Sequence, residues 1–358
     1  MKHFILFTLG GLVLIALIMQ NDPDLGPLIR EFHIITVSIL LEALPFILLG
    51  ALVSGIIEVT ISRDRFARLI PANPLAALGL AGLLGLAFPI CECGIIPVVR
   101  RLIRKGVPFH LVITYMLAAP IVNPVVILAT IVAFRGSPAL VPVTAGRIAG
   151  GFLIAVAIGA LTARMARRIP PLPAASAPAS NDHAGHDAGD HDHDDCGCAD
   201  HDHADACAHD APARTGFLAG ARRVLGHAAD DFFTIGPYLI LGACIAGLMR
   251  SVAVTTDGTT HRLTDLVLGA GPRQVPLMMA MAFLLSLCSE ADAFFARAFA
   301  VGTPGTLAFL VLGPMLDIKL ILMYFRVFTP RFIAFLVTAI IVINLLVWLA
   351  AAFVMGGG

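Results

Sequence analysis

The amino-acid sequence contains seven apolar runs that are each long enough to cross a lipid bilayer as an α-helix. They cover residues 4–20, 34–57, 109–134, 141–163, 231–249, 304–325 and 331–355, and about 20 residues span the hydrocarbon layer. The composition agrees, because 58% of the 358 residues are hydrophobic and only 13% are charged. A soluble domain would be nearer half apolar and a quarter charged. The sequence therefore predicts an all-α, polytopic membrane protein.

Two further apolar stretches, 75–99 and 274–296, are interrupted by polar residues at their centres. If every stretch spans and the N-terminus is cytoplasmic, Lys and Arg divide into 11 inside and 12 outside. If both interrupted stretches enter and leave on one side, 16 lie inside, seven lie outside with Arg147 among them, and Lys319 lies in a span. Cytoplasmic loops are enriched in Lys and Arg, so we predict broken or re-entrant hairpins and a cytoplasmic central loop.

Short motifs recur in the same order in the two halves of the chain. The pairs are Pro45–Gly55 with Pro237–Gly247, Cys91-Glu92-Cys93 with Cys288-Ser289-Glu290, Gly106–Pro108 with Gly302–Pro304, and Pro120–Asn123 with Pro314–Asp317. With re-entrant hairpins each copy has three spans, so the second copy is inverted, as in many secondary transporters. The alternative is that Gly and Pro are simply frequent in membrane helices, and the glycines serve either close packing or flexibility.

This repeat predicts four segments along the chain. An extra N-terminal helix and loop occupy residues 1–30, and the first membrane repeat occupies 31–163. A hydrophilic loop follows at 164–228, and the second membrane repeat occupies 229–358.

The segment Phe88–Pro97 places two thiols and a carboxylate, Cys91, Glu92 and Cys93, between helix-breaking Pro and Gly residues. A broken helix at membrane depth is tolerated only against protein or a water-filled cavity, and a carboxylate there indicates a transport pathway or proton relay. Soft thiolates favour Cu(I) and Zn(II). We predict a translocation site to which the second hairpin adds Cys288, Glu290 and Asp292.

Three further polar residues fall within apolar runs. Asn123 and Asp317 occupy equivalent repeat positions, and Asp317 and Lys319 form either a static ion pair or part of the proton pathway. We include all three in the predicted translocation site. Glu42 and Glu58 are interpreted as interfacial residues near the ends of the second run.

Residues 181–210 of the central loop combine His, Asp and Cys in a sequence that cannot form a hydrophobic core. These side chains are the ligands that Zn(II) and Cu prefer, whereas a plain acidic linker would explain the Asp but not the His and Cys. We predict a cytoplasmic metal-capturing loop, with no obligatory cofactor besides the transported ion. Its predicted ligands are His183, His186, His191, His193, Cys196, Cys198, His201, His203, Cys207 and His209.

The sequence also limits the mechanism. It has no Gly-x-x-x-x-Gly-Lys-Ser/Thr motif, so the chain itself is not expected to hydrolyse ATP. We predict secondary transport, with protons exchanged through Glu92, Glu290 or Asp317. The zero net charge gives no indication of nucleic-acid binding, and the expected surroundings are the lipid bilayer.

Three motifs carry a resemblance to a known family, namely Phe88–Pro97, Ala119–Pro124 and Leu287–Asp292. The chain resembles the predicted permeases that include the methylarsenite efflux permeases, and within them the branch named as copper/zinc efflux transporters. The resemblance covers nearly the whole chain and implies export of thiophilic species across the bacterial inner membrane.

The main prediction is thus a permease, not an enzyme, that exports Zn(II) or Cu(I). One alternative is efflux of a trivalent organoarsenical held by Cys91, Cys93 and Cys288, although imidazole and carboxylate groups in the loop add little for As(III). A second alternative is a membrane thiol oxidoreductase that uses Cys91 and Cys93, for which a Cys-x-Cys disulfide would close a very small, strained ring.

Overall fold

The computed structural model describes residues 26–60, 70–87, 90–165, 217–255, 271–299 and 301–356, and the regular elements in these ranges are helices. Six segments are long and apolar enough to cross a membrane. They are Leu28–Ile57, Phe109–Ala133, Leu140–Met165, Val224–Met249, Thr303–Tyr324 and Pro330–Val354. These segments confirm six of the seven predicted runs, and the first run, 4–20, lies outside the described residues.

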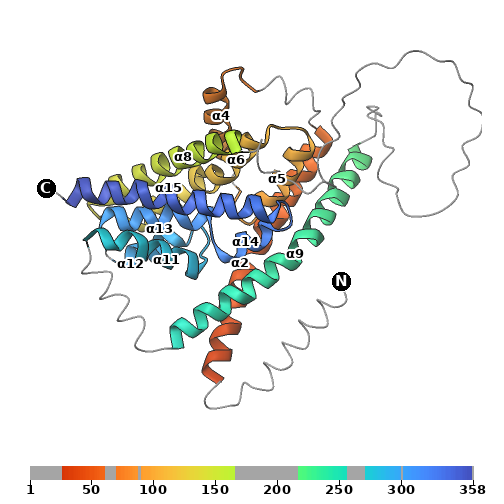
Figure 1. Ribbon diagram of the computed structural model, residues 1–358. Coiled ribbons are helices and arrows are strands. Elements are labelled where there is room, and N and C mark those ends of the chain that lie inside the picture. The colour runs from red at the N-terminus through yellow and green to blue at the C-terminus, as the bar shows by residue number, and fades with distance from the viewer. Residues whose placement is uncertain are drawn as a thin grey trace, which may run out of the picture.

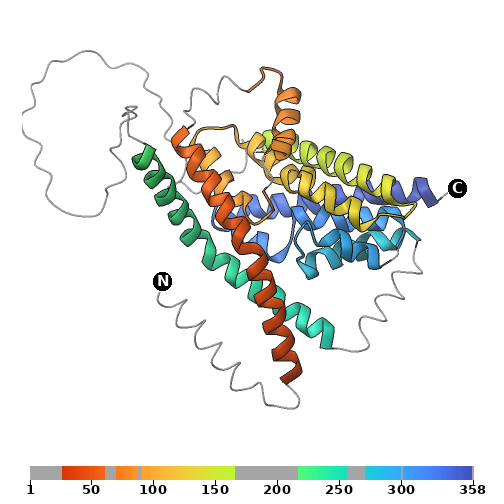
Figure 2. The ribbon, with the colours of Figure 1, turned by 180° about the vertical axis from the view of Figure 1, so that it is seen from behind.

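Two long helices, α2 (Gly26–Thr60) and α9 (Phe217–Thr255), pack along each other on one flank of the molecule (Figures 1 and 2). Thr36 of α2 lies against Gly247 of α9, whereas Gly55 of α2 lies against Val224. The two helices are therefore antiparallel. Equivalent helices of inverted repeats must run in opposite directions, so this orientation agrees with the predicted repeat, which itself stays a prediction.

The remaining helices form a bundle to which each half of the chain contributes three mutually packed helices. In the first half these are α4 (Pro74–Ala87), α6 (Phe109–Val122) and α8 (Leu140–Met165), and in the second half they are α11 (Gln274–Leu285), α13 (Thr303–Met315) and α15 (Pro330–Gly356). Helix α13 also contacts α6 and α8, which joins the halves. Nearly every residue of α6 and α13 is buried, so these two helices form the centre of the bundle (Figure 1).

Two of the spans are interrupted near their middle. Helix α6 ends at Val122, and α7 (Pro124–Ala133) begins after Asn123. In the same way α13 ends at Met315, and α14 (Ile318–Tyr324) begins after Asp317. The predicted runs 109–134 and 304–325 are thus pairs of half-helices rather than continuous helices.

The two interrupted stretches also consist of short helices. Helix α4 is followed by a turn at residues 92–94 and by α5 (Ile95–Arg104). The 3-10 turn η2 (Gly271–Arg273) leads into α11, and residues 286–291 connect α11 to α12 (Asp292–Ala298). Neither α4 nor α11 is long enough to span alone. The breaks are confirmed, while entry and exit on one side of the membrane stay predictions.

Glycine allows the backbone of α2 to lie directly against the backbone of the first break, the segment between α4 and α5. The second break is the segment 286–291 between α11 and α12. A Cβ atom added to Gly50 would overlap the carbonyl group of Gly94, and one added to Gly94 would lie 2.5 Å from the carbonyl oxygen of Phe46. No side chain fits between these backbones. Of the two roles considered for the repeated glycines, close packing is therefore the one that Gly50 fulfils.

We expect Gly50→Ala to destabilise the protein by at least about 1–3 kcal/mol, because α2 must move away from the first break. Gly79→Ala in α4 is the matched control, since nothing lies within 4 Å of a Cβ atom there and Ala favours helix. Thermal unfolding of the purified protein in detergent measures both variants. Equal melting temperatures for the two would contradict the packing role of Gly50.

Candidate functional site

The two breaks of the interrupted stretches meet inside the bundle. Ser289, from the second break, donates a hydrogen bond of 2.6 Å to Glu92 Oε2 in the first break. Glu92 is 1% exposed, and its Oε1 atom has no hydrogen-bond partner among the residues that the structure describes. This contact joins residues that are 197 positions apart in the chain. It brings the thiols beside Glu92 into the same region as Cys288.

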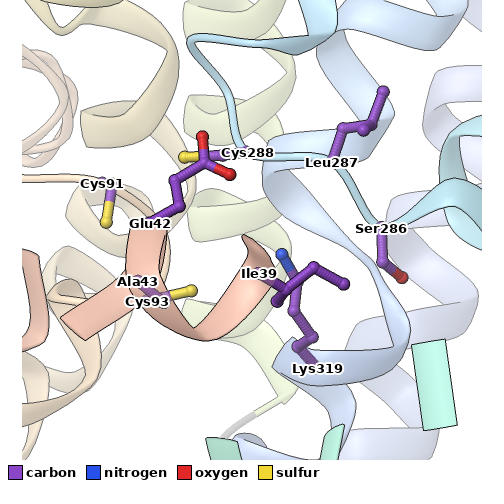
Figure 3. Close-up of a pocket in the computed structure, with 9 residues that line it drawn as sticks. All are labelled: Ile39, Glu42, Ala43, Cys91, Cys93, Ser286, Leu287, Cys288 and Lys319. Carbon is purple, nitrogen blue, oxygen red and sulfur yellow. The ribbon is translucent and has the colours of Figure 1, made fainter. Parts of the chain in front are cut away.

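A small pocket opens between the breaks, α2 and α14 (Figure 3). Cys91 and Cys93 line it from the first break, Cys288 from the second and Lys319 from α14. The rest of the lining is Ile39, Glu42, Ala43, Ser286 and Leu287. The cavity volume of this pocket is only about 20 Å³, which is room for a water molecule or an ion.

The three thiols are free and buried. Cys288 donates a hydrogen bond of 2.7 Å to Glu290 Oε2. The first break contains a turn at residues 92–94, and both Cys91 and Cys93 line the pocket. Within the described part of the chain, no group of three or more His, Cys, Asp or Glu residues is already arranged as a metal site. Metal binding at the thiols therefore stays a prediction.

The predicted equivalent residues Asn123 and Asp317 have the same structural role. Asn123 Oδ1 accepts a hydrogen bond of 2.9 Å from the backbone of Val125 at the start of α7. Asp317 Oδ1 accepts one of 2.6 Å from the backbone of Leu320 at the start of α14. Each side chain caps a half-helix whose first N–H groups would otherwise be unpaired. Asn123 does not line the pocket, whereas Asp317 is linked to it through Lys319.

Lys319 connects this capping residue to the thiols. Its ammonium nitrogen lies 3.3 Å from Asp317 Oδ2, and the side chain is buried. Figure 3 shows it reaching from α14 into the pocket. The predicted Asp317–Lys319 pair is therefore present.

Glu42 was missed as a site residue. We interpreted it as interfacial, but it lies at the middle of the candidate span Leu28–Ile57 and lines the pocket. The apolar run alone did not define where α2 begins. The candidate span begins at Leu28, before the predicted run 34–57, so the centre of the span lies at Glu42.

A second omission is Arg147, which we counted among the loop residues on the outer side of the membrane. It lies within α8, is 1% exposed, and forms an ion pair of 2.9 Å with Asp292. It also donates hydrogen bonds to the Ser289 carbonyl oxygen and to Thr130. Asp292 therefore lies behind the second break and fixes it to α8, and does not line the pocket.

A third buried charge joins the long helices to α5. Asp231 of α9 accepts hydrogen bonds from Arg101, at 3.1 Å, and from Ser54 of α2, at 2.7 Å. The nearby Arg100 lies 3.7 Å from its other carboxylate oxygen. Asp231 stands at the start of the predicted run 231–249, so the sequence alone indicated a span boundary and gave no sign of its partners.

The predicted loop ligands, from His183 to Cys207 and His209, lie outside the described residues. Cys244 does not line the pocket and is half-buried on α9.

Six candidate spans, broken helices and a small pocket between them that is lined by thiols and a lysine are the features of a membrane permease. The sequence model of the ArsP_1 family, described as predicted permeases, matches residues 28–353, and the chain belongs to this family. The match confirms the permease family indicated by the three motifs.

Two relatives cover most of the chain. The UPF0718 protein YcgR of Bacillus subtilis (strain 168) is 38% identical over 320 residues, which are 88% of this chain and 95% of that protein. A protein of Streptococcus mutans serotype c, named as a subunit of a two-component membrane permease complex, is 34% identical over 302 residues, which are 84% of this chain and 87% of that protein. No solved structure matches the chain. Membership of a permease family agrees with a transporter rather than an enzyme.

We expect Arg147→Met to destabilise the protein by about 3–5 kcal/mol, because Asp292 is left as a buried charge without its partner. The double variant Arg147→Met/Asp292→Leu should recover much of this loss, and Arg135→Met, at an exposed position, should stay within about 0.5 kcal/mol of wild type. Unfolding midpoints in detergent measure these three variants and the single change Asp292→Leu. A double variant as unstable as the sum of its single changes would contradict a coupled ion pair.

Proposed function

We propose that the chain exports a thiophilic metal ion, Zn(II) or Cu(I), across the bacterial inner membrane through the pocket lined by Cys91, Cys93 and Cys288. The convergence of three buried thiols from two breaks on one small pocket supports this proposal. Thiolates are preferred ligands of these ions. The resemblance to copper/zinc efflux transporters points to the same substrate class.

The mechanism that we propose is secondary transport coupled to protons. The hydrogen bond from Cys288 to Glu290 supplies a route. When a metal–sulfur bond forms at Cys288, the S–H bond breaks and the proton passes to the Glu290 carboxylate. Return of the proton to sulfur breaks the metal–sulfur bond and releases the ion, because protonation competes with metal binding.

Efflux of a trivalent arsenical remains the second candidate, because three thiols also suit that substrate. The His, Asp and Cys residues of the central loop favour the metal. We propose that this loop is cytoplasmic and captures metal ions for the pocket.

The relative from Streptococcus mutans supports a further proposal, that this chain works with a second protein subunit. Co-purification of a defined second membrane protein with the tagged chain, expressed at its native level, would test this. A chain that transports in vesicles containing no other protein would contradict an obligatory partner.

Everted vesicles provide the direct test of metal export. Cys91→Ser should lower the uptake rate of Zn(II) or Cu(I) at least about tenfold, because it removes a thiolate ligand. Cys244→Ser is the matched control, since Cys244 does not line the pocket, and its rate should equal that of wild type. If wild-type vesicles accumulate methylarsenite and neither metal, the arsenical candidate is correct.

The loop is tested by replacing residues 181–210 with a Gly/Ser segment of the same length. We expect the half-saturating metal concentration to rise several-fold while the maximal uptake rate is retained, because the loop concentrates metal ions but the pocket moves them. Metal-concentration series in the same vesicles measure both quantities. Complete loss of uptake would mean that the loop belongs to the transport pathway.

A further inference from the structure

The pocket holds a positive charge among its thiols. Lys319 is 2% exposed, its ammonium nitrogen lies 3.3 Å from Asp317 Oδ2, and its side chain lines the pocket together with the three thiols. A buried ammonium ion is unfavourable unless negative charge compensates it. Its position therefore requires an explanation in a pocket that we propose for a cation.

The backbone fixes Lys319 in this place. Gly242 of α9 packs directly on it, because a Cβ atom added to Gly242 would lie 2.9 Å from the Lys319 Cα atom. Helix α14 is also anchored at its first turn, where Asp317 caps it. These contacts hold the Lys319 backbone where its side chain reaches both Asp317 and the pocket.

Asp317 provides only part of the compensation. One of its oxygens accepts the 2.6 Å bond from Leu320, and the other lies 3.3 Å from the Lys319 ammonium nitrogen without forming a hydrogen bond. Lys319 has three N–H donors, so it can be shared between Asp317 and a second anion. The thiols that line the pocket with Lys319 would supply this second anion when they bind a metal ion.

The charge of the possible complexes separates the two substrate classes. Zn(II), Cd(II) or Cu(I) held by three thiolates gives a complex with net negative charge. A trivalent arsenical held by two or three thiolates gives a neutral complex. A fixed ammonium ion stabilises the first by direct attraction and has little effect on the second.

We propose that Lys319 is the counter-ion of an anionic metal–thiolate complex formed at Cys91, Cys93 and Cys288, and that it thereby selects metal cations over trivalent arsenicals. This inference rests on the proposed function, since it requires the thiols to bind the transported species. It adds a specificity-determining residue that does not itself bind the metal.

The test compares Cd(II) with phenylarsine oxide on the full-length protein in detergent. Equilibrium dialysis measures the binding of each probe to wild type and to each Lys319 variant. The same measurement is made on each of these proteins with the additional change Cys91→Ser. Subtracting the second value from the first removes the contribution of the central loop. Lys319→Met deletes the charge, and Lys319→Arg keeps it. Melting temperatures show whether each variant is folded.

In Lys319→Met we expect the affinity of the pocket for Cd(II) to fall at least about tenfold, because a buried unit charge is lost from the pocket that binds the ion. The affinity for phenylarsine oxide should change less than about twofold, and Lys319→Arg should keep most of the Cd(II) affinity. The unchanged arsenical affinity also shows that the pocket is intact in the variant.

Other outcomes would overturn the inference in distinguishable ways. If the affinities for both probes fall equally in Lys319→Met, Lys319 is a structural residue. The same conclusion holds if Lys319→Met is unfolded while Lys319→Arg is folded and shows no preference for Cd(II). A rise in Cd(II) affinity would mean that the ammonium repels cations. If wild type shows no binding that depends on Cys91, the proposed function is wrong, and the counter-ion role is wrong with it.

Discussion

In the hydrocarbon layer, every backbone or side-chain polar group freed by a broken helix must find a partner within the protein. In the described part of the chain the helices are interrupted in four places, and residues at those breaks bond to one another or to the ends of the same helices. Asn123 and Asp317 cap half-helices, while Ser289 joins the second interrupted stretch to Glu92 of the first. The need to pair these groups explains why the two interrupted stretches meet inside the bundle.

The same requirement concentrates reactive groups in a small volume. Three thiols, a lysine and a glutamate line one pocket, and further carboxylates lie just behind it. The substrates that we propose for these thiols differ in the charge of the complex that each would form. The proposed counter-ion role of Lys319 would make that charge the basis of selectivity.

Close packing and buried ion pairs hold the breaks in position. Gly50 lets α2 contact the backbone of the first break, and Gly242 lets α9 contact α14. Arg147 ties the second break to α8 through Asp292, and Asp231 ties α9 to α5. The antiparallel pair α2 and α9 thus touches α5, which directly follows the segment with Cys91 and Cys93, and α14, which carries Lys319.

The sequence by itself determined the membrane class, six of the candidate spans and the chemistry of the two interrupted stretches, because apolar length and helix-breaking Pro and Gly are local properties. It also indicated Cys91, Cys93, Cys288 and Lys319, since such residues are rarely placed at membrane depth without a function. Only the tertiary structure decided that Asp292 pairs with Arg147, that Glu42 lines the pocket and that Asp231 binds Arg101. These partners lie on different helices, and the crossing of helices sets their contacts, which no spacing along the chain records.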